Sequence, residues 1–356
     1  MRTAIIGLPM TGKTSLFTIL TGVHESTRVG SMETRVGVSK VPDPRLDALA
    51  TIFEPPKITH AVVEYVDFPA ISKETLRDPQ YLASLRVVDA LAHVLRVFED
   101  PTVPHEKGSV DALRDCEDVD IELILSDLVV AEKRLERLEK DRKKLKNPEL
   151  DHEFEVLTRA KAFLEENKPL REMTLTDDEE KRLRGFQFLS QKSMLFVINA
   201  GEENASRLHE LEEEYKAKLG NKPRTNVAAV CGKIEAELAE LGPDEAKELM
   251  DSYGLTEPGL DRIITASYAL LGLMSFLTAG ETEVRAWTIP QHSPAVKAAG
   301  AIHSDFEKKF IRAEVVNWKN LVDLKGYPGV REKGLLRLEG KEYIVKDGDV
   351  LVIRHS

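Results

Sequence analysis

The stretch Gly7-Leu-Pro-Met-Thr-Gly12-Lys13-Thr14 decides the fold of this 356-residue chain. It satisfies the pattern G-x-x-x-x-G-K-[ST], in which glycines let main-chain N–H groups converge on phosphate oxygens. In that pattern Lys13 reaches the terminal phosphates of a nucleoside triphosphate, and the Thr14 hydroxyl binds Mg²⁺. Apolar residues from Thr3 to Gly7 predict a strand before the motif, and Lys13 to Leu20 predicts a helix whose positive end favours the anion. The alternative is an ordinary strand–helix turn, and the flanking strand and helix argue against it.

Further apolar segments along the chain predict the rest of a sheet. Continuous apolar strands that alternate with helical stretches are typical of a largely parallel sheet covered on both faces. The predicted fold class is therefore α/β, with the mostly parallel sheet of a P-loop NTPase. The strands predicted after the first one are Val62–Asp67, Ala90–Phe98, Met194–Asn199 and Asn226–Val230.

A change of composition near Ile121 predicts a helical arm inserted between the third and fourth strands. Apolar residues spaced three, four and three apart indicate a coiled-coil seam. The break at Asn147-Pro148, followed by a second helical stretch, predicts an antiparallel hairpin. Thr176 and Glu179 then form a capping-box pattern that predicts the start of another helix. The seam residues are Leu128, Ala131, Leu135 and Leu138.

The residues after Gly280 predict a small α+β domain of about the size of a ubiquitin-like fold. Apolar and polar residues alternate from Glu283 to Thr288, which indicates a half-buried strand. Leu336 and Leu338 on one side of Gly340, with Tyr343 and Val345 on the other, predict a hairpin, and a last strand is predicted at Val350–Ile353. The predicted domains are 1–118 with 188–278 for the nucleotide, 119–187 for the arm and 279–356 for the small C-terminal domain.

Composition restricts the class of protein. The two cysteines indicate a reducing compartment rather than a disulfide framework or a zinc cluster. No apolar run is long enough to predict a membrane span, and no signal peptide is predicted, so we expect a cytoplasmic protein. The net charge of −11 disfavours whole-molecule attraction to nucleic acid, but residues 131–147 hold eight basic and four acidic side chains, a net of +4. This basic segment fits docking on a ribonucleoprotein, or equally a solvated helix face.

A second metal-binding group is predicted at the end of the second strand. A carboxylate at such a position holds Mg²⁺ in P-loop proteins, and Asp67 fits, although it could also be a helix N-cap or a surface-turn carboxylate. The segment Asp67-Phe-Pro-Ala70 resembles the DxxG of GTPases with Ala in place of Gly. Ile71 lies where Ras-like enzymes carry a water-orienting Gln, so we expect slow hydrolysis. His105 is a speculative substitute for that Gln, and a lone loop histidine is more often solvated.

Base recognition is predicted at the ends of the fourth and fifth strands. The fourth strand ends Asn199-Ala-Gly-Glu202, where GTPases show N-K-x-D, and the fifth ends Cys231-Gly232-Lys233, where they show S-A-K. A missing lysine and a longer carboxylate weaken guanine selection and indicate that adenine is accepted. Considered without the P-loop, Asn199 could equally be a turn residue that follows a strand.

Several longer segments resemble the YchF/Obg-like ATPases of the translation-factor class of P-loop proteins. The resemblance covers nearly the whole chain, and long matches are far more specific than a P-loop. It implies a nucleotide domain, an inserted coiled coil and a TGS domain, with ATP hydrolysed in preference to GTP and association with ribosomes. The matching segments are Val41–Asp47, Ala92–Asp100, Glu122–Asp127, Glu132–Glu139, Thr278–Thr288, Ala301–Lys308 and Arg337–Tyr343.

The resemblance also implies roles for individual residues. The phosphates would be wrapped by Met10, Thr11, Gly12, Lys13, Thr14 and Ser15, and the base contacted by Asn199, Ala200 and Gly201. Ser31 falls where the family has the switch Thr that ligates Mg²⁺. This chain departs from the family pattern at Met10, where Asn is usual, and at Ala70 and Ile71, where Gly and Leu are usual.

Together these patterns predict a Mg²⁺-dependent ATPase that acts as a slow, ribosome-associated switch and exists as a monomer without membrane contact. Lys13 and Asp67 are its expected catalytic residues, and Thr14, Ser31 and Asp67 its expected metal ligands. Two alternatives stay open: a conventional GTPase, and an adaptor that senses a nucleotide without hydrolysing it.

Overall fold

A computed structural model describes residues 1–23, 34–72, 74–144 and 146–356, and its contacts divide the chain into two compact units. The first unit comprises Met1–Val38 and Glu64–Leu270, and the second comprises Ser39–Val63 and Leu271–Ser356. Within the described ranges no helix is both long and apolar enough to cross a membrane. The domain boundaries predicted from the sequence stay a prediction, but the grouping of residues 39–63 with the C-terminal residues was not anticipated.

A six-stranded sheet forms the centre of the first unit, and each predicted strand is present. The pairs β1–β4, β1–β5, β5–β6 and β6–β7 are all parallel, as predicted. Every residue of β5 is buried, as expected for a parallel strand with both faces covered. In sheet order the strands are β2 (Arg35–Lys40), β4 (Val62–Asp67), β1 (Arg2–Ile6), β5 (Ala90–Arg96), β6 (Ser193–Asn199) and β7 (Thr225–Val230).

Helices cover both faces of this sheet because successive side chains of each strand point to opposite faces. On β6, Phe196 and Ile198 pack in a core with residues of α3, α4 and α7, whereas the equally buried Val197 points to the other face. The Tyr65 hydroxyl of β4 donates a 2.9 Å hydrogen bond to the Ser267 hydroxyl of α10, which lies on that second face. The helices of this part are α1 (Lys13–Thr21), α3 (Pro79–Arg86), α7 (Leu208–Tyr215), α8 (Gly232–Glu240), α9 (Pro243–Tyr253) and α10 (Gly259–Leu270), with short turns η1 (Thr75–Arg77), η3 (Glu202–Arg207) and η4 (Lys216–Gly220).

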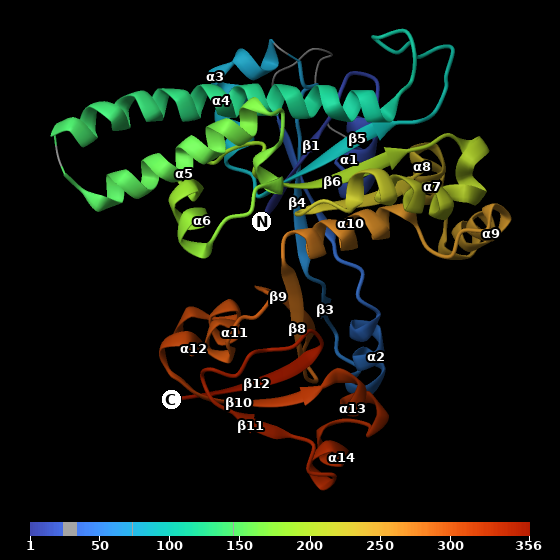
Figure 1. Cartoon of the computed structure of the whole chain (residues 1–356). Helices are drawn as coiled ribbons and strands as arrows, with labels where there is room; N and C mark the ends of the chain where they lie inside the picture. Colours follow the sequence, from blue (N-terminus) through green and yellow to red (C-terminus); the bar gives the residue numbers. More distant parts are fainter. Residues whose placement is uncertain (24–33, 73, 145) are drawn as a thin grey trace. The chain divides into compact units, whose positions relative to one another are not determined.

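The predicted helical arm is present as a hairpin of α4 (Ala112–Lys144) and α5 (Pro148–Glu165) that extends away from the sheet (Figure 1). Ala131, Leu135 and Leu138 are buried in its own apolar core, and Leu128 packs against that core. Asn147 caps α5 by accepting a hydrogen bond from Glu149 N, and Pro148 occupies the first helical position, where its missing N–H is harmless. After η2 (Leu170–Glu172), the predicted capping box opens α6 (Asp177–Arg184).

The second unit contains a mixed six-stranded sheet around its own apolar core. The pairs β8–β9, β10–β11 and β10–β12 are antiparallel, whereas β12–β8 and β3–β9 are parallel. In order, the strands are β11 (Arg337–Glu339), β10 (Phe310–Asn317), β12 (Asp349–His355), β8 (Leu273–Ala279), β9 (Val284–Pro290) and β3 (Ile58–Thr59). Its helices are α2 (Pro44–Phe53), α11 (Ala295–Ile302), α12 (Ser304–Lys308), α13 (Trp318–Asp323) and α14 (Tyr327–Glu332).

One expectation for this unit is wrong: residues 336–345 do not form a hairpin with each other. The strand β11 pairs with β10 instead, and the segment around Tyr343 and Val345 bonds to the chain before α11. Val345 N donates to Ser293 O at 3.0 Å, and Ala295 N donates to Tyr343 O at 2.7 Å. Local alternation identifies an extended segment, but it does not choose the partner, which depends on the tertiary fold.

Candidate active site

The predicted phosphate-binding loop connects β1 to α1, and its backbone requires glycine at two positions. Gly7 has φ +145° and Gly12 has φ +91°, values that residues with a side chain rarely adopt. A Cβ added to Gly7 would lie 2.7 Å from the carbonyl oxygen of Val94, and one added to Gly12 would lie 2.5 Å from Nδ2 of Asn199. The two glycines therefore allow the loop to lie against β5 and the end of β6.

Met10 also has a positive φ, of 59°, although it is not glycine. Asn tolerates this left-handed conformation better than most residues, because its short polar side chain bonds locally. The family resemblance implied Asn at position 10. The Met in this chain therefore occupies a position of backbone strain. The Met10 side chain is 63% exposed, so it does not pack in the core to offset that strain.

Lys13 is buried at the start of α1, where its ammonium donates a 2.6 Å hydrogen bond to the carbonyl oxygen of Leu8. Burial lowers its pKa from 10.5 to about 8, against the opposing effect of the nearby acidic groups of Asp67 and Glu106. A phosphate group placed in the loop would supply the negative charge that a buried ammonium needs. The buried ammonium is therefore suited to an anionic ligand.

The metal-binding residues predicted on α1 and β4 do come together. The Thr14 hydroxyl donates to Oδ2 of Asp67 at 3.2 Å. The other carboxylate oxygen of Asp67, Oδ1, is buried and has no hydrogen-bond partner among the described residues. An orphaned carboxylate oxygen beside a hydroxyl is a donor set that suits Mg²⁺, which prefers hard oxygen ligands. Ser31, the third predicted ligand, lies outside the described residues.

Arg35 of β2 is a site residue that the sequence patterns did not identify. Its guanidinium forms an ion pair with Oδ2 of Asp67 at 2.5 Å, and the two side chains are only 9% and 8% exposed. The two residues are 32 positions apart, and no motif links them. Arg35 thus shares the carboxylate that would hold a metal ion.

Asn199 joins two loops of the site rather than standing free at the end of β6. Its side-chain Nδ2 donates to Thr11 O at 3.0 Å, and its Oδ1 accepts from Gly232 N at 3.1 Å. Ala200, which follows, is buried and its N–H donates to Val230 O at 2.8 Å. Asn199 therefore fixes the spacing between the phosphate loop and the predicted base-binding residues.

The other predicted base-binding residues lie at the ends of β6 and β7. Glu202 forms an ion pair with Lys233 at 2.5 Å, so its carboxylate has a basic partner. Both side chains are at least 38% exposed, and such surface pairs are weak. Cys231 is buried, and burial raises the pKa of its thiol, so it packs as a small apolar residue.

Neither Ile71 nor His105 presents a free polar side-chain atom for orienting water. Ile71 is 2% exposed and belongs to the core, and its N–H donates to Gly7 O at 3.0 Å. His105 Nδ1 accepts from Lys107 N at 3.1 Å, so Nε2 carries the proton that bonds Oδ2 of Asp115 at 2.8 Å. Both nitrogens of His105 are thus already bonded.

His93 of β5 is a second residue that the sequence analysis did not select. It is 1% exposed, and neither ring nitrogen has a hydrogen-bond partner among the described residues. Burial, followed by the positive charges of Lys13 and Arg171, lowers the pKa of His93 to about 3. A polar residue within an apolar strand was the available signal, and the structure shows a ring that stays neutral behind the phosphate loop.

Taken together, these residues offer a buried ammonium, two glycine-dependent turns, a hydroxyl and a carboxylate around one loop. Such a set can hold a triphosphate and a hard divalent cation.

Known proteins resemble this chain in sequence and in fold. The family model YchF-GTPase_C, described as "Protein of unknown function (DUF933)", matches residues 273–356. The solved structure of the Schizosaccharomyces pombe YchF GTPase superposes with a TM-score of 0.86 at 26% identity, over 99% of this chain and 97% of that one.

Two curated relatives match at higher identity, and both are named ribosome-binding ATPase YchF. The protein of Bacillus subtilis is 38% identical over 99% of this chain and 98% of its own length. The protein of Pasteurella multocida is 39% identical over the same shares of the two chains. With such identity over nearly the whole length, this chain belongs to the YchF family.

Proposed function

We propose that this protein is a Mg²⁺-dependent ATPase that hydrolyses ATP slowly and acts as a nucleotide-regulated switch on the ribosome. The observation that carries the proposal is the meeting of Thr14 and Asp67 beside the buried Lys13, in a chain whose relatives are named ribosome-binding ATPases. The three side chains are those that P-loop enzymes use for phosphoryl transfer.

Different residues of the chain bind the phosphates and the Mg²⁺ ion. Main-chain N–H groups of residues 10–15 surround the phosphates, and the Lys13 ammonium leaves the carbonyl of Leu8 for the terminal phosphates. Thr14 and Asp67, with Ser31 as the third proposed ligand, would hold Mg²⁺, which neutralises charge on the phosphate oxygens. Phosphoryl transfer needs positioning and charge neutralisation above all, and this set supplies both, apart from the orientation of the attacking water.

Slow turnover follows from the side chain at position 71. In Ras-like enzymes a Gln there orients the attacking water, and an isoleucine in the core cannot do so. Water would then be positioned by main-chain groups, by a partner, or by His105 after its bond to Asp115 opens. We therefore expect ribosomes to stimulate ATP hydrolysis strongly.

A preference for ATP over GTP is proposed from the ends of β6 and β7. Guanine selection uses an aspartate opposite the base edge and a lysine beside it, whereas this chain has the longer Glu202 and Ala200 at those positions. The relative from Schizosaccharomyces pombe is called a GTPase, which keeps the conventional GTPase as the second candidate. Competition of ATP against GTP for the purified protein decides between them, and a clear GTP preference would reject the adenine assignment.

Hydrolysis itself is tested by single-turnover assays with and without ribosomes. We expect hydrolysis product in both assays, and faster release of that product when ribosomes are present. Absence of product in both would favour a non-hydrolysing adaptor, for which the altered segment at Ala70 and Ile71 is the structural reason.

Replacing Lys13 by Ala is expected to weaken triphosphate binding about 10- to 100-fold, since a hydrogen bond to a charged group contributes about 1.5–3 kcal/mol. Unchanged affinity in that variant would remove the basis of the proposal.

The remaining proposals concern location and partners. We propose that the protein acts in the cytoplasm as a monomer and contacts the ribosome through the arm (119–187) and the TGS-like domain (279–356). The arm presents exposed basic residues near its tip, where Lys140, Lys143 and Lys144 lie on the solvent side of α4. Such a tip suits the phosphate backbone of RNA.

A further inference from the structure

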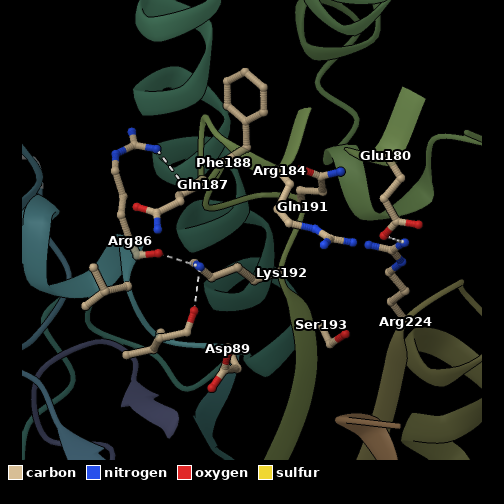
Figure 2. Close-up of a pocket in the computed structure, with 12 residues that line it drawn as sticks. Arg86, Asp89, Glu180, Arg184, Gln187, Phe188, Gln191, Lys192, Ser193 and Arg224 are labelled. Carbon is tan, nitrogen blue, oxygen red and sulfur yellow. Dashed lines mark hydrogen bonds and ion pairs between the residues drawn. The ribbon is translucent and has the colours of Figure 1, made fainter. Parts of the chain in front are cut away.

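A pocket of about 330 Å³ lies in the first unit (Figure 2). It is at the amino ends of β5, β6 and β7, at the opposite end of the sheet from the phosphate loop. Its lining includes Asp89, just before β5, Ser193, at the start of β6, and Arg224, just before β7. The phosphate loop follows the carboxyl end of β1, and β1 runs parallel to β5. The pocket is therefore separate from the proposed nucleotide site.

The lining is predominantly basic. Four basic residues from four different segments face two acidic ones, a net of +2. Pockets of about 300 Å³ and above are large enough for small ligands, and one of this charge favours an anion. The basic residues are Arg86, Arg184, Lys192 and Arg224, and the acidic ones are Asp89 and Glu180.

Two of the basic side chains, those of Arg86 and Lys192, are held in place by hydrogen bonds. Arg86 donates to Asp127 Oδ1 at 3.2 Å and to the Ser126 hydroxyl at 3.0 Å. The Lys192 ammonium donates to the carbonyl oxygens of Arg86 at 2.8 Å and Val88 at 2.6 Å. Its two partners are neutral carbonyls, so its charge is not cancelled by a directly bonded carboxylate. Burial accordingly lowers the pKa of Lys192 to about 8.

The other two basic side chains are available for a ligand. The Arg184 side chain has no hydrogen bond or ion pair with any described residue, and Figure 2 shows its guanidinium directed toward that of Arg224. Arg224 pairs with Glu180, but these side chains are 39% and 38% exposed, and pairs of that kind are easily exchanged. Two guanidinium groups that point toward each other are stabilised by an anion between them.

The backbone of the pocket is strained at two of its lining residues. Gln187 has φ 50° and Arg224 has φ 57°, both in the left-handed region that non-glycine residues rarely adopt. Strained backbone of this kind concentrates at ligand sites, where the surrounding structure holds it.

We propose that this pocket binds a small phosphorylated ligand, gripped between Arg184 of α6 and Arg224 at the start of β7 over the ammonium of Lys192. Guanidinium groups bind phosphate through paired N–H donors, and the lysine adds a compact charge. Because α6 packs on α5 of the arm and β7 belongs to the sheet, a bound phosphate ties the arm to the sheet. The proposal is independent of the ATPase assignment, since it shares no residue with the nucleotide site.

Calorimetric titration of the full-length protein with inorganic pyrophosphate tests the proposal, with the phosphate loop saturated by a non-hydrolysable ATP analogue. We expect binding to the unmodified protein and at least a tenfold loss in the double variant Arg184→Ala/Arg224→Ala. Arg207→Ala is the matched control, because Arg207 is an exposed arginine of the same unit that does not line the pocket, and its affinity should be unchanged. Hydrogen exchange of α6 should slow when pyrophosphate is added.

Three results would overturn the proposal. The first is no pyrophosphate binding once the phosphate loop is saturated, and the second is equal affinity in the double variant. The third is a short single-stranded oligoribonucleotide that binds in an Arg184- and Arg224-dependent way while pyrophosphate does not, which would assign the pocket to an RNA backbone. Both arginines are exposed, so the variants are expected to fold, and unchanged thermal unfolding confirms this.

Discussion

The side-chain amide of Asn199 donates a 3.0 Å hydrogen bond to the main-chain carbonyl of Thr11, so the end of β6 is fastened to the phosphate loop. The same side chain accepts from Gly232 N at 3.1 Å. One residue therefore sets the distance between the parts proposed to hold the phosphates and the base. A buried bridge of this kind makes the site rigid before a nucleotide arrives.

Replacing Asn199 by Ala should weaken nucleotide binding and destabilise the fold. The change leaves a buried carbonyl and an N–H without partners, which costs about 1–3 kcal/mol. Titration with an ATP analogue and urea unfolding measure the two effects. Asn204→Ala is the control, since Asn204 is a half-buried neighbour whose side-chain amide bonds only the Glu203 side chain. Equal behaviour of the two variants would contradict the bridging role.

The affinity for a nucleotide should fall as the pH rises above about 8. Above pH 8 the folded, nucleotide-free protein progressively loses the Lys13 proton, whereas the unfolded chain keeps it up to about 10.5, so folding stability rises between these values. A bound phosphate favours the ammonium, so binding in this window must take up a proton. Calorimetry at pH 7 and 9 in buffers of different ionisation enthalpy detects that uptake.

The Lys192 ammonium has a similarly lowered pKa, so stability curves alone do not isolate Lys13. Lys192→Met serves as the control for nucleotide affinity, because Lys192 lies at the opposite end of the sheet and should leave the proton uptake intact. An affinity that stays constant from pH 7 to 9 would show that Lys13 does not titrate with the ligand.

Replacing Arg35 by Ala should lower stability without Mg²⁺ and lower the Mg²⁺ concentration needed for ATP-analogue binding. Removing one partner of a buried ion pair destabilises by about 3–5 kcal/mol, because the carboxylate of Asp67 loses its ion-pair partner. A metal ion would then supply the missing positive charge. Thermal unfolding with and without Mg²⁺ and the analogue measures this compensation.

Arg2→Ala is the matched control for Arg35, since Arg2 pairs with Glu64 while 53% exposed. A surface pair contributes about 0–1 kcal/mol, so this variant should be close to the unmodified protein. If Mg²⁺ failed to recover stability in Arg35→Ala, Asp67 would not be a metal ligand.

Replacing Ile71 by Ala should reduce stability by about 2–5 kcal/mol while leaving the hydrolysis rate per folded molecule unchanged within about twofold. The side chain is in the core, so its removal leaves a cavity but takes nothing from the reacting atoms. Single-turnover rates at a temperature where the variant is folded, compared with its unfolding midpoint, separate the two effects. A large loss of rate in fully folded protein would assign Ile71 a direct part in hydrolysis.

Reversing Lys140, Lys143 and Lys144 to Glu should weaken ribosome co-sedimentation and make it less sensitive to salt, because fewer counterions are released. Arg142 should be kept, since its guanidinium stacks over Phe154 at 4.2 Å and holds the two helices of the arm together. Reversal of Lys218, Lys222 and Lys247, outside the arm, is the control of equal charge. Unchanged co-sedimentation of the arm variant would favour a merely solvated helix face.

The sequence by itself determined the phosphate loop, the parallel strands, the arm and the pairing of Thr14 with Asp67. These follow from local rules: glycine spacing at Gly7 and Gly12, apolar runs, and the common edge at which parallel strands end. The seam through Ala131, Leu135 and Leu138 was predicted for the same reason, since helical period alone decides which face is buried.

Only the tertiary structure decided which distant groups meet. Arg35 reaches Asp67, Asn199 reaches Thr11, and Arg184 faces Arg224, although no local pattern links the members of each pair. The partner of β11 and the grouping of residues 39–63 with the C-terminal unit were likewise unpredictable. Periodicity determines which face of a segment is buried, whereas its partner is selected by long-range packing that depends on the whole chain at once.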